Sequence, residues 1–571
     1  MTRGRSLARL GGRASLARRL AFGSIPEISE RLGRRTLPLP GKDHARSPGT
    51  QRSWSAAVPV ISDRVGVLVA TATAAVLGML FLGHKSYWLD EGYSIAFTSM
   101  PSGRFFGLLV HVEPNMALYY ASLKVWRLLG DSEALVRSLS VIGFVSTVPI
   151  LAAIARRTSS GSAAVAAAIF FATNAFVIRY AQEARAYALL MLAVSGSALL
   201  LLRAIEHPSR GRLVAYALVS AAAVHLHVFA LLVIGAQVAT VVAVAIASGA
   251  RGPRAILRID DLAAGRLIAA WAGIGVLLVP LGAAMLFGGA SGKLSWLPRP
   301  TILPSNARTP SLVGVLEDHA GHGGYGLLAL VLAFAAIGLV DAWRAWRSGT
   351  SASQRLASLL IPMWFVLPLA AAFVVSFAKP VFHPRFLLVA LPPLALLVGR
   401  GIASARPRAA AAVGAAATIV IAGFSLVHWY RDFQNEDWRG AASLVVSSAR
   451  PGDAIAFVPG RIRMPFEVYL HKPRTPLPAF PSEPWGSFDA LSPQRADIGA
   501  ALSEVRASRV WLVISHYEVA ERATAIATMD GRYTLVSSTV LPAEQPFTRR
   551  PFEPGIEIRL YERTERQAKT D

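Results

Sequence analysis

The sequence predicts a polytopic α-helical membrane protein that ends in a small α/β extracytoplasmic domain. Three observations lead to this prediction. Of the 571 residues, 53% are hydrophobic and only 16% are charged, whereas soluble domains carry about 25% charged residues. Long apolar runs without charge recur between residues 58 and 428, as expected of membrane-spanning helices. Residues 429–571 instead have no net charge and alternate helix-like with strand-like segments.

Residues 1–57 are predicted to be a disordered, basic cytoplasmic tail. Residues 1–60 carry a net charge of +9, are rich in Arg, Gly, Pro and Ser, and lack helical periodicity. The first apolar run begins near residue 58, too far downstream for a signal peptide. We expect the tail to lie at the anionic inner leaflet. The net charge of +24 does not indicate a nucleic-acid partner, because the soluble-looking part of the chain is neutral.

About eleven membrane-spanning helices are predicted within residues 58–428, which form the predicted transmembrane domain. Each span needs ~20 apolar residues. The stretch 116–129 is also apolar, but Lys124 and Arg127 interrupt it, and we interpret it as an amphipathic helix along the membrane interface. The predicted spans are 62–83, 134–154, 162–178, 186–203, 213–229, 230–248, 267–288, 325–343, 357–378, 385–401 and 409–428.

Arginines between the spans predict the orientation of the protein in the membrane. With a cytoplasmic N-terminus and eleven spans, the short arginine-bearing loops all fall on the inner side. The outer side then receives the loop 84–133 and the C-terminal domain 429–571. Counting 116–129 as a twelfth span would move the arginine loops outside. The inner arginines are Arg156, Arg157, Arg210, Arg212, Arg251, Arg254, Arg258, Arg266, Arg344, Arg347, Arg355, Arg400, Arg406 and Arg408.

The C-terminal domain, residues 429–571, is predicted to contain both helices and strands. Residues 438–448 have a helix-like pattern, and a Pro-Gly-Asp turn follows them. Short runs rich in β-branched and aromatic residues then predict strands. These strands are expected at 454–458, 509–515, 533–540 and 556–561.

An adjacent pair of carboxylates, Asp90 and Glu91, follows the first predicted span directly. The pair lies in the outer loop, close in sequence to Lys85 and Tyr93. Neighbouring carboxylates at a membrane surface repel each other and lose hydration, so a chemical role is a reasonable interpretation. An ordinary solvated loop with interfacial aromatic residues is the alternative, and the residues alone do not decide between them.

The same outer loop continues with His111 and Glu113, just before the predicted interfacial helix. Together with the carboxylate pair they could bind a metal ion, although nothing in the spacing requires one. We expect no metal or other cofactor to be required. Arg137 begins the second span from the outside, where it could contact a lipid phosphate or extend to the headgroups.

Two further outer turns contain arginines that depart from the positive-inside pattern. One turn holds Glu183 and Arg185, and the other holds His383 and Arg385. Arginines on the outer side favour a bound anion, although Glu183 could instead pair with a neighbouring arginine. Acids and arginines that gather on one face favour an enzyme acting on a lipid-borne substrate. A lipid-linked-sugar transporter or flippase would place such groups at mid-membrane, and it remains an alternative, as does a non-enzymatic envelope assembly protein.

Five of these motifs, spread in order over residues 60–430, together resemble the GT-C glycosyltransferases. The resemblance is to the bacterial branch of protein O-mannosyltransferases and aminoarabinose transferases. It implies a GT-C fold and transfer of a sugar, mannose or another hexose or pentose, from a polyprenyl-phosphate-sugar donor. The acceptor would be a hydroxyl of a glycan, lipid or protein on the outer face of the bacterial cytoplasmic membrane. The five motifs are Asp90-Glu91, the His111–Tyr120 stretch, Arg137, the Tyr180–Tyr187 turn and His383-Pro384-Arg385-Phe386.

The resemblance also implies roles for individual residues. Asp90 would be the catalytic base and Glu91 its companion carboxylate. The expected donor-phosphate ligands are Arg137, Arg185, Arg385 and Lys85. The residues expected to shape the acceptor side are His111, Glu113, Tyr93, Glu183 and His383. Relatives usually carry a second aspartate and paired prolines where this chain has Glu113-Pro114-Asn115-Met116.

Elementary chemistry agrees with such a transfer. A hydroxyl needs a base to accept its proton as the new bond to the sugar forms. A lipid phosphate is a good leaving group when arginines neutralise its charge. One base without an enzyme nucleophile predicts inversion at the anomeric carbon. Adjacent carboxylates on one backbone rarely flank a bond from opposite sides, which argues against a glycosidase.

Overall fold

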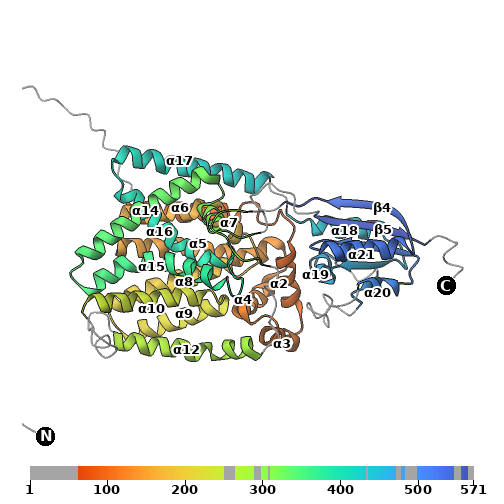
Figure 1. Ribbon diagram of the computed structural model, residues 1–571, viewed down its shortest axis with the longest axis horizontal. Coiled ribbons are helices and arrows are strands. Elements are labelled where there is room, and N and C mark those ends of the chain that lie inside the picture. The colour runs from red at the N-terminus through yellow and green to blue at the C-terminus, as the bar shows by residue number, and fades with distance from the viewer. Residues whose placement is uncertain are drawn as a thin grey trace, which may run out of the picture. The chain divides into compact units, whose positions relative to one another are not determined.

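The structure is a computed structural model in which a helical bundle precedes a C-terminal domain with one β-sheet (Figure 1). The predicted tail, residues 1–57, lies outside the residues that the structure describes. The described residues are 62–249, 264–287, 297–305, 309–432, 435–470, 477–482, 498–544 and 555–563.

Each of the eleven predicted spans coincides with a helix or a bent pair of helices. By length and apolar composition, eight of the described helices can cross a membrane, or nine if the bent pair α6–α7 counts as one span. Helices α1 and α9 have 17 residues each, at the short end of the range for a span. A polytopic helical fold is confirmed, whereas the number eleven stays a prediction. The helices are α1 (Asp63–Met79), α5 (Glu133–Thr158), α6 (Gly161–Thr173), α7 (Ala175–Ala181), α8 (Tyr187–Glu206), α9 (Arg210–Leu226), α10 (Ala230–Ala247), α12 (Ala264–Phe287), α14 (Gly324–Ser348), α15 (Ala352–Val375), α16 (Leu391–Ser404) and α17 (Arg408–Val427).

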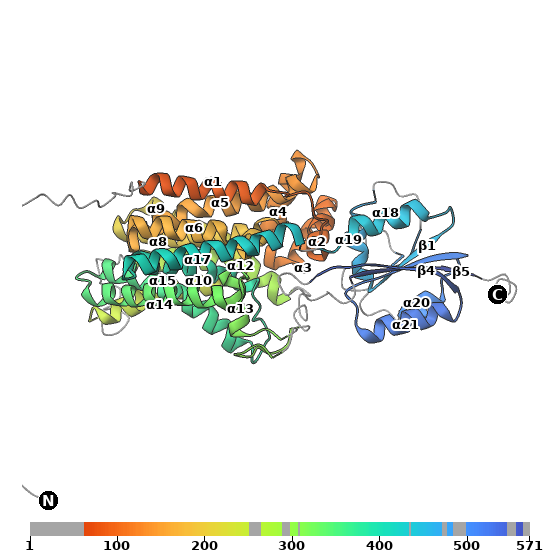
Figure 2. The same ribbon diagram turned by 90° about the horizontal axis from the view of Figure 1, so that it is seen from above.

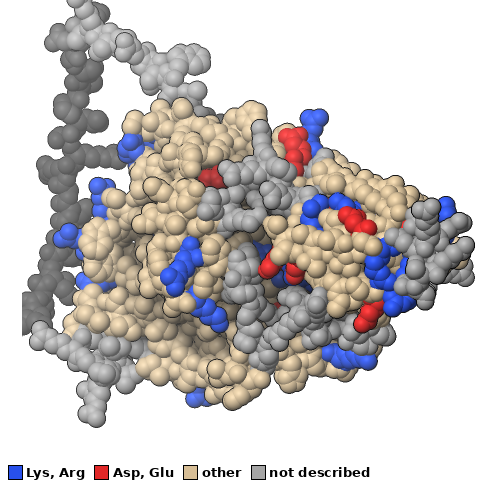
Figure 3. Space-filling view, turned by 45° about the vertical axis from the view of Figure 1, so that its right-hand side comes forward, with Lys and Arg blue, Asp and Glu red and all other residues tan. Residues whose placement is uncertain are grey.

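The surface of the bundle is apolar, as a lipid-facing surface must be. Large hydrophobic side chains are exposed along α1, α12, α15 and α17, among them Leu68, Val276, Val374 and Phe424. Figure 3 shows that most of the surface on the viewed face is uncharged. Inside the bundle, α14 and α16 approach closely at Gly401. A Cβ atom there would lie 1.8 Å from the Phe334 carbonyl oxygen, so only glycine fits. Small residues at such contacts are typical of membrane helices.

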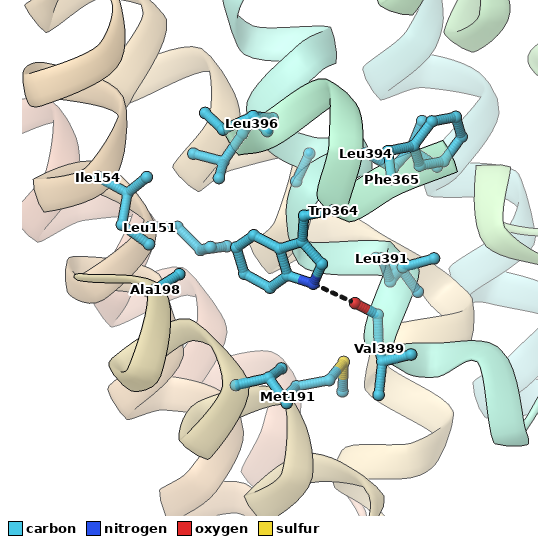
Figure 4. Close-up of a cluster of buried hydrophobic side chains, with 14 of the residues drawn as sticks. Leu151, Ile154, Met191, Ala198, Trp364, Phe365, Val389, Leu391, Leu394 and Leu396 are labelled. Atoms are coloured by element: carbon cyan, nitrogen blue, oxygen red, sulfur yellow. Dashed lines mark hydrogen bonds between the residues drawn. The ribbon is translucent and has the colours of Figure 1, made fainter. Parts of the chain in front are cut away.

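Two helix breaks place the outer turns. Asn174 ends α6 and caps α7 by accepting a hydrogen bond from the Val177 N–H at 3.1 Å, and the two helices meet at 61°. The last predicted span begins as a 3₁₀ turn, η4 (Phe386–Ala390), before α16. There the indole of Trp364 donates to the Val389 carbonyl at 3.0 Å from within a cluster of buried apolar side chains (Figure 4). A backbone carbonyl at the break is thus hydrogen-bonded within the protein. This contact holds the segment that directly follows Arg385.

The outer segment between α1 and α5 is largely helical, which the sequence predicted only for 116–129. Helix α4 buries Tyr119, Tyr120 and Leu123 and exposes Leu118 and Val125. It is amphipathic, as predicted, and it is not among the candidate spans. The elements here are α2 (Leu89–Ser99), α3 (Ser102–His111), η1 (Pro114–Met116), α4 (Ala117–Trp126) and η2 (Arg127–Leu129), and α13 (Leu312–Ala320) precedes α14.

The C-terminal domain has a five-stranded sheet with the order β2-β1-β3-β5-β4. Strand β1 pairs in parallel with β2 and β3, and β5 pairs antiparallel with β3 and β4. Helices cover both faces, α18 and α19 on one and α20 and α21 on the other (Figure 2). The predicted helix and four predicted strands are confirmed to within one residue at either end. The elements are η5 (His428–Asp432), α18 (Trp438–Ser448), β1 (Ala454–Val458), η6 (Gly460–Ile462), α19 (Arg463–Glu467), β2 (Leu477–Phe480), α20 (Ile498–Ser503), β3 (Arg509–Ile514), α21 (Val519–Asp530), β4 (Thr534–Leu541) and β5 (Ile556–Glu562).

The C-terminal domain packs directly on α2. Leu89 of α2 belongs to the buried cluster that includes Trp438 and Phe466 of the C-terminal domain. Met464 of α19 in turn packs into the cluster formed by the outer segment. Gly92 allows the close approach, since a Cβ atom there would lie 2.6 Å from the Cα atom of Pro465. The helix that carries the predicted acidic pair is therefore held by both parts of the chain.

Candidate active site

Asp90 and Glu91 are adjacent in the first turn of α2, but their side chains have different partners. Glu91 is buried, and its Oε1 accepts hydrogen bonds from the Arg137 Nε at 2.8 Å and from the Ala184 N–H at 2.7 Å. Its Oε2 accepts one from the Arg137 Nη2 at 2.7 Å. Glu91 therefore ties α2 to α5 and to the turn before α8.

Arg137 uses all five of its N–H groups inside the protein. Besides Glu91, it donates to the carbonyl oxygens of Leu82, Lys85 and Ser86 at distances between 2.8 and 3.1 Å. A guanidinium has only five N–H donors, so none is left for a phosphate. This geometry gives no support to the expectation that Arg137 binds the donor, which stays a prediction, and it shows that Glu91 is paired with Arg137.

Asp90 instead meets two arginines from distant parts of the chain. Its Oδ2 accepts a hydrogen bond from the Arg385 Nη1 at 2.9 Å, and the Arg185 Nη2 lies 3.8 Å away. The Asp90 side chain is 16% exposed. Burial alone would raise the pKa of the Asp90 carboxyl, but the charges of Arg385, Arg185 and His516 outweigh it and hold this pKa below its usual value. Asp90 is thus ionised at neutral pH.

Several buried polar atoms near Arg185 have no hydrogen-bond partner among the described residues. They are the Arg185 Nε, the Tyr187 hydroxyl and the His227 Nε2. The rings of Tyr187 and His227 lie 6.0 Å apart, and the charges of Arg185 and Arg385 act on both side chains. Unsatisfied buried donors beside two arginines indicate a place for an anion.

The Nη1 group of Arg185 holds the guanidinium in position. Its Nη1 lies 3.1 Å from the Tyr120 hydroxyl, 3.3 Å from the Asp90 carbonyl and 3.4 Å from the Ser94 hydroxyl. These partners lie on α2 and α4 of the outer segment. The guanidinium is held in place while its Nε stays available.

A cavity of about 150 Å³ lies on the Glu91 side of α2. Its wall includes Lys85, whose ammonium group donates to the Trp429 carbonyl and lies 3.8 Å from the centre of the Trp429 ring. Burial, followed by the charges of Arg137 and Arg179, lowers the pKa of Lys85 to about 7. Lys85 is therefore only partly charged at neutral pH. The cavity is also lined by Trp88, Gln182, Glu183, Asn435, Glu436 and His516.

Glu183 lines the same cavity and is paired with Arg179, at 3.1 Å between Nε and Oε1. The alternative that Glu183 pairs with a neighbouring arginine is thus confirmed. Its Oε2 is buried without a hydrogen-bond partner among the described residues. Burial raises the pKa of the Glu183 carboxyl to about 7 in spite of Arg179.

The other residues expected to shape the site differ in their positions. Tyr93 stacks on Phe97 with the ring centres 6.0 Å apart, and the charges of Asp90 and Glu113 act on it. His383 accepts a hydrogen bond from the Arg385 backbone N–H at 3.3 Å. These residues therefore lie at the site. His111 is exposed at the end of α3, and no hydrogen bond or ion pair joins it to the described residues of the site. The role expected for His111 stays a prediction, and the described contacts give it no support.

Among the described residues, the ligand atoms of Glu317, Asp318 and His322 all lie within 4.8 Å of one another and could hold a metal ion. The His322 Nδ1 lies 3.1 Å from the Asp318 Oδ1, a contact that also forms without a metal. Asp90 does not belong to this group. The arginines occupy the position beside Asp90 that a cation would otherwise take.

The sequence placed Tyr187 in one of the five motifs and His227 in an outer turn, but it assigned neither a role. It did not single out Glu436 or His516, because nothing local marks these two residues. All four are brought to the site by contacts between segments far apart in the sequence.

No family model and no curated protein matches the sequence of the chain. The chain does, however, share its fold with solved structures of ArnT and of an archaeal oligosaccharyltransferase, in line with the GT-C fold expected from the motifs. ArnT from Cupriavidus metallidurans in the apo state is similar with a TM-score of 0.56 and 14% identity, covering 88% of this chain and 99% of that chain. The same protein bound to undecaprenyl phosphate gives 0.52 and 14% identity, covering 88% and 98%. The archaeal oligosaccharyltransferase AglB from Archaeoglobus fulgidus, in complex with an inhibitory peptide and a dolichol-phosphate, gives 0.50 and 11% identity, covering 83% and 73%.

Proposed function

We propose that this multi-pass membrane protein is an inverting glycosyltransferase. It moves a sugar from a polyprenyl-phosphate-sugar donor to an acceptor hydroxyl at the outer face of the bacterial cytoplasmic membrane. The single observation that carries the proposal is the contact of Asp90 with Arg385 at 2.9 Å, beside the unsatisfied Nε of Arg185. These two features support a base next to an anion site. Support also comes from the fold, which is shared with a protein bound to undecaprenyl phosphate.

In the proposed reaction, the arginines bind the phosphate of the donor. Arg385 and Arg185 then exchange part of their contact with Asp90 for contacts with phosphate oxygens. Asp90 becomes a better base when this happens, because neighbouring positive charge no longer holds its proton affinity down. The Tyr187 hydroxyl can donate to the same phosphate. Arg137 holds the position of α2 through Glu91 and does not contact the donor.

The bond changes balance without a cofactor. The acceptor oxygen forms a bond to the anomeric carbon as its proton passes to Asp90. The bond between that carbon and the phosphate oxygen breaks, and the lipid phosphate leaves with its negative charge held by the two arginines. Attack opposite to the leaving group inverts the anomeric configuration. No metal ion is part of the proposed reaction.

The test is sugar transfer by the purified full-length chain in liposomes supplied with polyprenyl-phosphate-sugar donors. Asp90→Asn should lower kcat by roughly 10²- to 10⁴-fold, the size of a lost general base. Asp131→Asn is the matched control, because Asp131 lies in the same outer segment with its side chain 68% exposed. Full activity in Asp90→Asn refutes Asp90 as the base. Movement of labelled lipid across the bilayer without a covalent product would show a transporter instead.

A further inference from the structure

We propose that Glu436 and His516 of the C-terminal domain are positioning residues for Asp90, so that this domain forms one wall of the active site. This inference rests on the proposed function, since it assigns the pair to the same transfer reaction.

The C-terminal sheet has a topological switch point between β1 and β3. These strands are parallel neighbours, and the chain leaves β1 toward β2 on one side but leaves β3 toward β4 and β5 on the other. In open α/β sheets, such a point opens a crevice beyond the carboxyl ends of the strands, where ligands bind. Arg461 follows β1 and His516 follows β3. Both residues therefore lie at the edge of the sheet where a functional site is expected.

His516 is held in an unusual conformation at this crevice. Its φ is +50°, in the left-handed region that non-glycine residues rarely adopt, and such residues concentrate at functional sites. The Arg461 Nη2 donates to the His516 carbonyl at 2.9 Å. The His516 Nε2 lies 2.8 Å from the Glu436 Oε1. The first contact thus holds the backbone of His516, and the second holds its imidazole.

Glu436 connects this imidazole to the helix that carries Asp90. Its Oε2 accepts hydrogen bonds from the Leu89 N–H at 3.1 Å and from the Trp438 indole at 2.7 Å. Leu89 is the first residue of α2, and N–H groups of a first helical turn have no partner within the helix. A carboxylate there is also favoured by the helix dipole. One buried carboxylate therefore holds both His516 and the start of α2, one residue before Asp90.

His516 acts on Asp90 through its charge. Groups from three separate segments lower the pKa of the Asp90 carboxyl: Arg385 before η4, Arg185 before α8 and His516 after β3. His516 also lines the cavity shared with Lys85 and Glu183. When the donor phosphate draws the two arginines away, the contribution of His516 to the low pKa of the Asp90 carboxyl remains.

The experiment compares the full-length wild type with H516Q and E436Q in the liposome transfer assay, over a range of pH. The matched control is H207Q, because His207 is exposed at the end of α8. We expect kcat to fall by roughly 10- to 100-fold in both variants, the size of a misplaced reacting group, with little change in the KM for the donor. The acid limb of the kcat profile should move to higher pH in H516Q, because Asp90 loses a neighbouring positive charge while Arg385 and Arg185 remain.

The outcomes separate this inference from the function on which it rests. A wild type that transfers no sugar refutes the proposed function. An active wild type with an unchanged kcat and pH profile in H516Q overturns only the role of the pair. Lower activity with a lower melting temperature and no shift of the acid limb also overturns it, because a docking contact alone would give that result. Should E436Q fail to fold, H516Q still decides, since the His516 side chain lies in a loop and is 15% exposed.

Discussion

Glu91 and Arg137 form a two-point ion pair in which each carboxylate oxygen accepts a hydrogen bond, at 2.8 and 2.7 Å, from a different nitrogen of the guanidinium. Their side chains are 1% and 3% exposed. The pair joins α2 to α5. The preceding residue, Asp90, instead contacts Arg385 and lies near Arg185. The two adjacent acids thus have separate partners: Glu91 pairs with Arg137, and Asp90 pairs with Arg385.

Breaking this pair should destabilise the protein. Glu91→Gln leaves a buried guanidinium without its counter-charge, and we expect the free energy of unfolding to fall by about 3–5 kcal/mol. The melting temperature in detergent measures the effect. Glu206→Gln is the control, because its pair with Arg157 is exposed and should contribute below about 1 kcal/mol. Equal shifts in the two variants would contradict the structural role of Glu91.

Replacing the two arginines at Asp90 by lysine should weaken donor binding. Lysine keeps the charge but cannot present two parallel N–H groups to a phosphate. Loss of one charged hydrogen bond, about 1.5–3 kcal/mol, predicts a rise of roughly 10- to 100-fold in the KM for the donor in Arg385→Lys and in Arg185→Lys. Arg210→Lys, at an exposed position at the start of α9, should leave KM unchanged. A fall in kcat with no change in KM would show that these arginines do not hold the donor.

The spans and most strands could be predicted from the sequence because their signal is local. Apolar runs mark the helices, and buried β-branched runs mark β1, β3 and β5. Strand β2 was missed, since it has four residues, includes Pro478 and lies at the edge of the sheet, where proline is tolerated. The outer helices α2 and α3 were missed because packing against α19 and α4, and not a long apolar run, stabilises them.

The site was predicted less completely than the fold. The sequence drew attention to Asp90, Arg185 and Arg385 because ionisable residues at the outer ends of spans are conspicuous. It could not distinguish Arg137 from Arg385, since the difference depends on which backbone carbonyls fold around each guanidinium. It also gave no sign of His516, whose relation to Asp90 exists only after the C-terminal domain docks on α2.

Stability should fall as pH rises through the range where Glu183 ionises. The pKa of this carboxyl is about 7 in the folded protein, against a usual value of 4.5, so the folded state binds more protons between these values. The free energy of unfolding then decreases from about pH 4.5 to about pH 7. Glu183→Gln removes this contribution, so its melting temperature should rise relative to the wild type across this range. In the control Glu206→Gln, the difference in melting temperature from the wild type should not depend on pH. If this difference does not depend on pH in Glu183→Gln either, the raised pKa of Glu183 is contradicted.

Removal of divalent metal ions should leave transfer activity unchanged. The group Glu317, Asp318 and His322 does not include Asp90, and the arginines supply the positive charge that the leaving phosphate needs. EDTA treatment of the liposome assay, followed by addition of Mg²⁺, Mn²⁺ or Zn²⁺, measures this directly. Glu317→Gln should behave like the wild type. Activity that EDTA abolishes and one of these ions restores would show that the proposed reaction is incomplete.

Gly92→Ala should impair transfer by separating α2 from the C-terminal domain. A Cβ atom at this position would lie 2.5 and 2.6 Å from the Cβ and Cα atoms of Pro465, and backbone cannot yield as a flexible side chain can. The shift would move Asp90 away from Arg385, so we expect kcat to fall by roughly 100-fold, as for a displacement of about 1 Å. Gly107→Ala is the matched control, because a Cβ atom there meets nothing within 4 Å. Normal kcat in Gly92→Ala would show that transfer does not depend on the tight contact between α2 and α19, and that Asp90 keeps its position when this contact is loosened.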